Sequence, residues 1–469
     1  MSEIVLKYIC PVSDIIFTED FLFMRIQLSE HFTYRKLLRF TLPSVIMMVC
    51  TSIYGVVDGV FVSNFVGSDA FAAVNLIMPF LMVLGAVGFM LGTGGSALVA
   101  YTLGAGNEKR ANEIFSLLIY VLIGLGAVFT IGGIALLTPM SRLLGASDAL
   151  LSYCTDYLRI LLLFAPASIL QLLFQSFFVT AEKPHLGFWF TVGAGCTNMV
   201  LDVLMVGIWG WGVEGAAIAT FISQLVGGVL PVFYFIDRSN TSRLHLCKTS
   251  FYSKVLRDAC INGSSELMTN LSMSLVNILY NYQLLRLAGE NGVAAYGVIM
   301  YAAFLFVAVF VGYAVGSAPI VSFHYGARNH AEVHNLYRKS LRLIAVVAVT
   351  LTLASMFIIP CVARIFVGYD AKLLALTSRA FRLYALSFLI MGFNVYASSF
   401  FTALGDGVTS ALISFLRTLA FQVIAILLLP LLLGIDGIWL AVTAAELAAL
   451  AVSAAMLLTK DKVFHYRKA

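Results

Sequence analysis

Charged residues are scarce in this sequence. Asp, Glu, Lys and Arg make up 11% of its 469 residues, whereas hydrophobic residues make up 61%. A soluble domain has roughly a quarter charged and about 45–50% apolar residues. The composition therefore excludes an ordinary soluble protein and predicts a polytopic protein of the lipid bilayer. The formal net charge of +5 is too small to indicate a nucleic-acid partner.

The sequence also lacks the signatures of common catalytic and metal chemistry. It contains no Walker A motif, no GxSxG, no HExxH and no paired CxxC. We therefore expect no direct use of ATP, no enzyme activity, no cofactor and no transition-metal centre. The seven cysteines have no paired spacing, which predicts small apolar residues rather than disulfides: Cys10, Cys50, Cys154, Cys196, Cys247, Cys260 and Cys361.

A cleavable signal sequence is absent from the first residues. Asp14, Glu19 and Asp20 interrupt the apolar run that a signal peptide needs. We interpret residues 1–23 as an upstream extension from a misplaced start. Met24 then begins the short basic lead that usually precedes a first membrane helix, with Arg25, Arg35, Lys36 and Arg39.

Twelve apolar segments follow, each of about 20 or more residues and so long enough to cross roughly 30 Å of hydrocarbon. The sequence therefore predicts an all-α polytopic membrane protein with twelve transmembrane helices; eleven and thirteen are the alternative counts. The segments run approximately over 39–65, 73–101, 114–138, 151–178, 186–207, 214–236, 259–287, 293–322, 341–362, 380–403, 409–433 and 437–459.

The basic residues predict the orientation. Lys and Arg are concentrated before segment 1, in the loops after segments 2, 4, 6 and 8, and after segment 12. By the positive-inside rule these loops and both termini are cytoplasmic, in the inner or plasma membrane. The longest polar break then divides the chain into a cytoplasmic tail, an N-lobe, a cytoplasmic linker, a C-lobe and a second cytoplasmic tail: residues 1–38, 39–236, 237–258, 259–459 and 460–469.

The two lobes are copies of one another. Gly104-Ala-Gly-Asn matches Gly326-Ala-Arg-Asn, and Gly212-Val-Glu-Gly-Ala matches Gly434-Ile-Asp-Gly-Ile, both 222 residues apart. Chance agreement between apolar sequences gives one such pair but hardly several in order. We therefore predict two pseudo-symmetric six-helix lobes in parallel topology around a central cavity.

One acid inside a segment breaks this repeat. Asp202 lies near one end of the apolar stretch 187–206, with Asn198 one helical turn before it. A carboxylate in hydrocarbon costs at least about 2.5–3.5 kcal/mol, so a chain keeps one where it faces a cavity or a partner. The alternative is a helix end whose Asp reaches the headgroups. At the 222-residue offset, Asp58, Asn198 and Asp202 correspond to Tyr280, Ala420 and Ile424, so the acid site belongs to the N-lobe alone.

Asp58 in segment 1 is the predicted partner of Asp202. Residue counting places both at a similar depth, and Thr220 and Tyr157 reach the same level from segments 6 and 4. Two neighbouring carboxylates in low dielectric cannot both ionise cheaply, so the pair would bind a proton. The oxygens of Asp58, Asp202, Asn198 and Thr220 could instead ligate Na⁺. The remaining alternative places the two acids in separate clefts.

Pro43 is a candidate hinge. It lies fifteen residues before Asp58 in segment 1, where proline removes a backbone hydrogen bond and bends a helix. A bend upstream of a titrating acid would act as a switch. The alternative is that Pro43 only begins the helix.

Other residues are candidates for the wall of a substrate cavity. Methionine adapts its shape to varied apolar ligands, and side-chain amides and carboxylates can bind polar or cationic groups. The candidates are Gln171, Gln175, Glu266, Met268 and Met391. Ordinary packing is the alternative for each of them.

These motifs resemble the multidrug and toxic compound extrusion (MATE) transporters over about residues 35–460. The resemblance rests on the duplicated lobes, on Tyr54-Gly-Val-Val-Asp58, on Asn198-x-x-x-Asp202 and on the repeated Gly-Ala-x-Asn loops. The family's bending proline and its cluster Tyr and Thr stand where Pro43, Tyr157 and Thr220 do. The turn Thr180-Ala-Glu-Lys-Pro departs from the family's usual Gly-Asp, which Gly405-Asp406 keeps in the C-lobe.

By this resemblance the chain is expected to be an antiporter that exports cationic amphipathic compounds in exchange for H⁺ or Na⁺. We expect it to work as a monomer without an obligate protein partner. One rival is a lipid-linked oligosaccharide flippase of the same superfamily, whose cavity should carry more basic residues than Arg417. Another is a membrane receptor or structural protein, which the duplication and the one-sided acids speak against.

Overall fold

The computed structural model describes residues 26–61, 66, 68–368 and 370–467 as a bundle of helices. In these residues, nine helices are each long and apolar enough to cross a membrane, and two bent helix pairs qualify together. The N-lobe holds α3 (Tyr34–Phe61), α4 (Ser68–Gly104), α5 (Glu108–Ala135), α6 (Leu137–Leu143), α7 (Asp148–Leu163), α8 (Ala165–Thr180), α9 (Pro184–Asp202), η2 (Val203–Ile208), α10 (Gly212–Gln224), η3 (Leu225–Val229) and α11 (Leu230–Ile236).

The C-lobe repeats this order. It holds α12 (Ser253–Gly326), α13 (His330–Val367), α14 (Ala371–Ala385), α15 (Phe388–Ala403), α16 (Gly407–Phe415), η4 (Leu416–Ala420), α17 (Phe421–Leu433) and α18 (Ile435–Thr459), and the short α19 (Asp461–Phe464) follows. The elements named η are π-helical, a form that is rare and often found at functional sites.

Helix α12 supplies two membrane spans. Its 74 residues would extend for roughly 110 Å if they were straight, several times the thickness of a bilayer. The chain reverses at Gly289, whose φ of 63° and ψ of −156° lie in a region open essentially to glycine alone. With α12 counted twice and each bent pair once, the twelve predicted segments are all helical.

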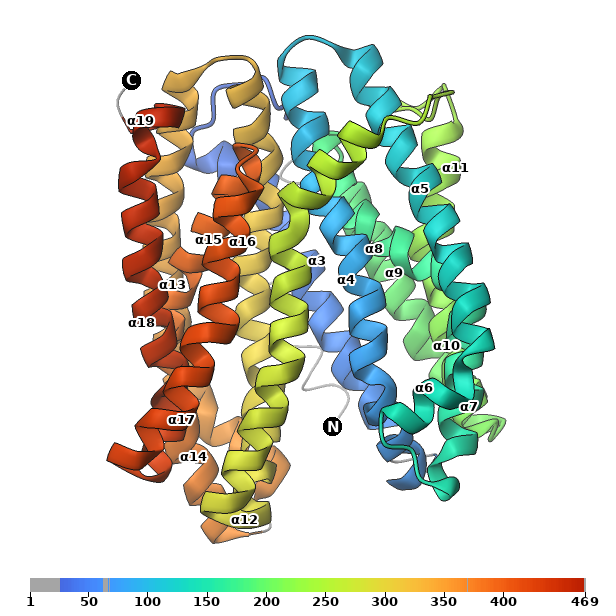
Figure 1. Cartoon of the computed structure of the whole chain (residues 1–469), viewed down its shortest axis with the longest axis vertical. Helices are drawn as coiled ribbons and strands as arrows, with labels where there is room; N and C mark the ends of the chain where they lie inside the picture. Colours follow the sequence, from blue (N-terminus) through green and yellow to red (C-terminus); the bar gives the residue numbers. More distant parts are fainter. Residues whose placement is uncertain (1–25, 62–65, 67, 369, 468–469) are drawn as a thin grey trace, which may run out of the picture.

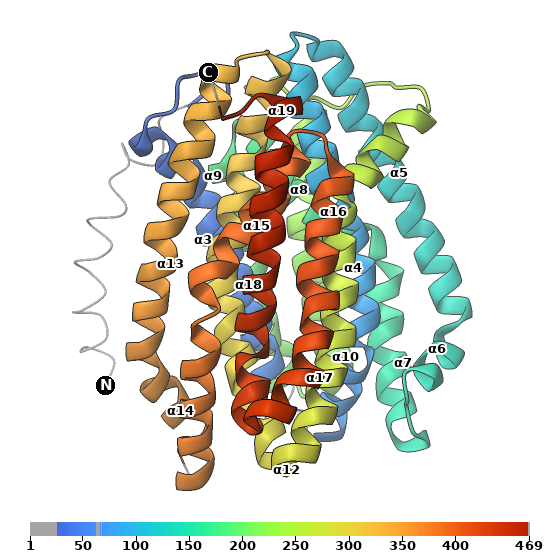
Figure 2. The ribbon, with the colours of Figure 1, turned by 60° about the vertical axis from the view of Figure 1, so that its left-hand side comes forward.

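The two bent spans occupy equivalent places in the lobes. Helices α7 and α8 meet at an angle of 62°, and α14 and α15 meet at 46°. Figure 1 shows the N-lobe and the C-lobe side by side, with α14 and the turn of α12 at the end of the molecule opposite α19. Figure 2 shows the same opposition after a turn of 60°. We call the end that carries α19 the basic end, because the predicted basic loops lie there.

The lobes contact each other most closely at the basic end, through glycines. A Cβ added to Gly104 would overlap the carbonyl oxygen of Phe323, and one added to Gly326 would overlap the carbonyl oxygen of Tyr101. Both pairs are related by the 222-residue offset of the repeat, so the pseudo-twofold axis passes between them. Away from this contact the ribbons of the two lobes diverge (Figure 1).

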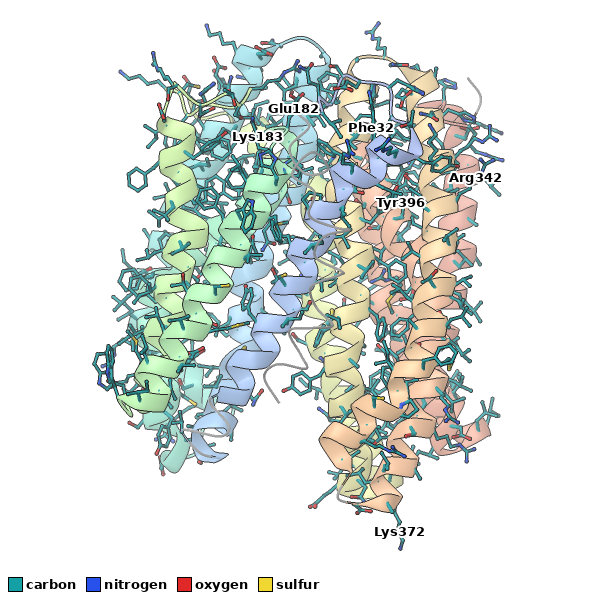
Figure 3. All side chains as sticks on the ribbon, turned by 180° about the vertical axis from the view of Figure 1, so that it is seen from behind. Phe32, Glu182, Lys183, Arg342, Lys372 and Tyr396 are labelled. Carbon is teal, nitrogen blue, oxygen red and sulfur yellow. The ribbon has the colours of Figure 1, made fainter. Side chains whose placement is uncertain are left out.

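A short segment, residues 26–33, crosses the basic end and joins the lobes; we call it the strap. The backbone N–H of Leu28 donates to Oε1 of Glu182 at 2.9 Å, and that of Phe32 donates to Oε1 of Glu332 at 2.8 Å. Nδ1 of His31 lies 2.6 Å from Oε2 of Glu332. Figure 3 shows Phe32 at the same end as Glu182 and Arg342, far from Lys372. Leu28 and Phe32 are fully buried, so this part of the predicted tail is packed structure.

Candidate functional site

The N-lobe cluster is built on three packed helices. Helix α10 packs against α9 and α7, which brings Thr220, Asn198 and Tyr157 into one region of the lobe. Nδ2 of Asn198 lies 3.5 Å from Oγ1 of Thr220 and donates to it. Asn198 and Tyr157 are 3% and 1% exposed, so both polar groups are removed from lipid and water. The structure therefore brings together residues that the sequence placed at one depth.

Asp202 is the last residue of α9, and the π-helical η2 begins immediately after it. Its exposed fraction is 0%, which contradicts a helix end that reaches the headgroups. Because Asn198 stands one turn earlier on α9, the two side chains share a helical face. A carboxylate buried at this junction lies where a π-helical turn most often marks function.

Helix α3 reaches this cluster from the other side. It packs against α9, and a Cβ added to Gly195 would lie 3.0 Å from Cδ1 of Tyr54. Tyr54 stands one turn before Asp58, and Gly195 stands about one turn before Asn198. The side chain of Asp58 lies outside the part of the chain that the structure describes, so its pairing with Asp202 stays a prediction.

The turns of the repeat correct the register used for the acid. Glu182 and Gly405 hold the equivalent left-handed backbone conformation, with φ of 59° and 82°, and they are 223 residues apart. Asp202 therefore corresponds to Ala425, one residue beyond the predicted Ile424. Ala425 is apolar and buried, so the described equivalent still carries no acid.

Pro43 lies inside α3 rather than at its beginning, because the helix starts at Tyr34. This excludes the interpretation that Pro43 only begins the helix. Across the lobe boundary, a Cβ added to Gly312 would lie 2.5 Å from Cα of Val45. The candidate hinge is therefore packed against the C-lobe helix α12, where a bend in α3 would be felt by both lobes.

A cavity lies between the lobes, with an empty volume of about 640 Å³; we call it the inter-lobe cavity. Its lining is rich in hydroxyl groups and carries one acid and one base, which are Glu266 and Arg417. The N-lobe contributes Thr93, Ser96 and Ser176, and the C-lobe contributes Glu266, Thr269, Val311, Ala314, Val315, Ala318, Val395, Ser398, Ser399, Thr402, Ser414 and Arg417.

A second cavity of about 620 Å³ lies within the C-lobe; we call it the C-lobe cavity. Aromatic and methionine side chains form most of its wall, and Arg417 and Glu446 are its charged groups. Its members include Met273, Tyr280, Tyr296, Met300, Phe304, Tyr384 and Met391. Apolar, adaptable walls with few polar groups are typical of sites for organic ligands.

The predicted cavity residues are distributed over different places. Glu266 lines the inter-lobe cavity and Met391 lines the C-lobe cavity. Gln171 and Gln175 are instead buried inside the N-lobe, where a Cβ added to Gly227 would lie 2.8 Å from Cδ of Gln171. Neither glutamine, nor the half-buried Met268, lines either of these two cavities.

Sequence reasoning missed the charged cluster of the C-lobe. Nε of Arg417 lies 3.6 Å from Oε1 of Glu446, and Nδ2 of Asn394 donates to Oε2 of Glu446 at 2.7 Å. Glu446 is 1% exposed. Arg417 was visible in the sequence as a basic residue in mid-segment, and a base at that depth requires an acidic partner. The sequence did not indicate whether Glu266 or Glu446 was that partner.

The chain is similar to one family over most of its length. The MatE family model matches residues 43–204 and 267–428, one match in each lobe. The multidrug export protein MepA of Staphylococcus saprophyticus is 22% identical over 436 residues, covering 92% of this chain and 95% of that protein. MepA of Staphylococcus aureus strain N315 is 21% identical over 431 residues, with the same coverage.

Solved structures share the fold. A multidrug resistance MATE family transporter of the MOP superfamily, in an outward-facing conformation, has a TM-score of 0.89 at 23% identity, covering 95% of this chain and 99% of that chain. A MOP superfamily transporter from Pyrococcus furiosus, in which reverse polarity of the binding pocket suggests a different function, has a TM-score of 0.85 at 23% identity, covering 96% and 99%. The polarity of the cavity thus has to be argued from this chain's own residues.

Proposed function

This chain belongs to the MatE family of multi-pass membrane transporters, and from that premise we propose that it exports cationic amphipathic compounds in exchange for H⁺ or Na⁺. The relatives named multidrug export protein support a broad range of substrates. The protein is a transporter and not an enzyme.

The observation that carries the coupling proposal is the complete burial of Asp202 beside Asn198 and Thr220. A buried carboxylate is stabilised either by a proton or by a cation, so it senses the external ion concentration. Asp202 then loads H⁺ or Na⁺ with Asp58, and α3 rearranges around Pro43. Since α3 and α12 are in close contact at Gly312, this movement passes to the second lobe.

The orientation of the chain supports export. We place the basic end, with the strap and α19, in the cytoplasm of a cell with an inner or plasma membrane. The lobes are in contact at that end and diverge toward the other, which corresponds to an outward-open state (Figure 1). One cation moving down about 100 mV supplies roughly 2.3 kcal/mol, enough for about a fiftyfold substrate gradient.

Flux in proteoliposomes with one gradient at a time tests the proposal and identifies the ion. Vesicles loaded with ethidium receive either an inward pH gradient or an inward Na⁺ gradient at constant membrane potential. We expect one of these gradients to drive dye export by the unmodified protein. Export that needs neither gradient, or no export with either, would contradict the antiport proposal.

A further inference from the structure

One arginine lines both cavities. Arg417 is on η4, and it contributes to the inter-lobe cavity together with Glu266 and to the C-lobe cavity together with Glu446. Its side chain is only 13% exposed. A single guanidinium therefore stands between two carboxylates that belong to different compartments of the protein.

The guanidinium is only weakly held on the described side chains. An arginine has five N–H donors, but within the described residues Arg417 has one ion pair, from Nε to Oε1 of Glu446 at 3.6 Å, and Nε makes no hydrogen bond. A bidentate pair would bring two nitrogens to about 2.7–2.9 Å. The side chain has therefore not settled into the tightest contact that its neighbours offer.

Glu446 is the fixed member of the cluster. Nδ2 of Asn394 donates both to Oε2 of Glu446, at 2.7 Å, and to its backbone oxygen, at 2.9 Å. Oε1 is left toward Arg417. Glu266, by contrast, lies on α12 at the wall of the inter-lobe cavity, where an entering ligand would meet it. The long arginine side chain on its π-helical turn is the part of this cluster best able to move.

We propose that Arg417 is a built-in counter-cation that decides which charge the inter-lobe cavity accepts. While the guanidinium faces Glu266, the cavity is electrically balanced and a lipophilic organic cation gains little there. When the guanidinium turns to Glu446 in the C-lobe cavity, Glu266 becomes the binding site for that cation. Arg417 is thus a specificity-determining residue, in a role that rests on the proposed function and names the acid that its substrates meet.

Two ions of matched shape and opposite charge test this role. Tetraphenylphosphonium and tetraphenylborate are bound to the purified full-length protein in detergent, without any ion gradient, and their dissociation constants are measured by equilibrium dialysis. In Arg417→Gln we expect phosphonium to bind about tenfold more tightly and borate about tenfold more weakly, a change of about 1.4 kcal/mol in each case. A residue with a structural role alone would move both constants in the same direction.

Two further variants complete the test. Arg382→Gln removes a positive charge from the exposed face of α14, outside both cavities, and should change neither constant. The double variant Arg417→Gln/Glu446→Gln leaves no uncompensated charge at the pair and should still shift the preference toward phosphonium, less than the single variant does. Unchanged or parallel constants in both Arg417 variants would overturn the inference. An unmodified protein that binds neither ion would contradict the proposed function itself.

Discussion

Equivalent helices of the two lobes carry opposite charges. The span formed by α9 and η2 in the N-lobe contains the buried acid Asp202, whereas its counterpart in the C-lobe, formed by α16, η4 and α17, contains the buried base Arg417. The preceding turn shows the same inversion at the 223-residue offset, with Lys183 in the N-lobe and Asp406 in the C-lobe. Duplication supplied one scaffold twice, and its charges then diverged.

This difference separates two tasks. An acid surrounded by amide and hydroxyl groups can take up and release a proton or a metal cation. An arginine shared by two carboxylates cannot change its own charge, because it stays protonated at any physiological pH. It can only change which carboxylate it neutralises. The N-lobe is therefore suited to the coupling ion, and the C-lobe to the charge of the substrate.

Removing the acid of the N-lobe should have the largest effect. Asp202→Asn keeps the shape of the side chain but removes its titration, so we expect resistance to ethidium to fall to the level of cells that lack the protein. Growth in ethidium measures this, with the amount of protein in the membrane as the control. Asp148→Asn, at a side chain that is 89% exposed, should leave resistance intact. Full resistance in Asp202→Asn would remove the functional distinction between the lobes.

Breaking the charge pair of the C-lobe should have the next largest effect, and on stability. Glu446→Gln leaves Arg417 with Glu266 alone, and we expect a loss of roughly 3 kcal/mol, near the lower end for a broken buried ion pair. The thermal midpoint of the protein in detergent measures it. Arg417→Gln/Glu446→Gln should recover part of the loss, since no uncompensated charge remains. A double variant less stable than either single one would show that the pair does not act as a unit.

The charge inversion at the turn should have the smallest effect, and one that depends on pH. Burial opposes ionisation of Asp406, but hydrogen bonds from Lys460 and Thr409 outweigh it and lower the pKa of this carboxyl. Because the native pKa lies below the unfolded value of about 3.9, the contribution to stability is present above that pH and is lost as the pH falls through the native pKa. Asp406→Asn should therefore lower the thermal midpoint at pH 7 and progressively less below about pH 4. An equal loss at both pH values would contradict the ionic explanation.

The sequence predicted the helices and the N-lobe cluster because both depend on local periodicity and depth. Apolar length placed the spans, and residue counting brought Asn198, Thr220 and Tyr157 to one level. The exact register of the repeat was beyond it. The insertion of one residue at the turn around Glu182 is visible only in the backbone conformation.

Contacts between distant segments could not be predicted. The choice of Glu446 as the ion-pair partner of Arg417 depends on how η4 and α18 pack, and Asn394 contributes from a third helix. Nothing in the local sequence indicates which of several acids in a membrane span lies within reach. The same holds for Gln171 and Gln175, which share a helical face as predicted but turn it toward η3.

The strap has a consequence for the birth of the protein. Phe32 donates to Glu332, which follows it by 300 residues, so a ribosome that adds 5–20 residues per second delivers the acceptor about 15–60 s after the donor. Until then only the Leu28 contact, to Glu182, has a partner available. One of the first stretches to be synthesised is thus among the last to be fixed, and closure of the strap over α13 marks a chain whose second lobe has arrived.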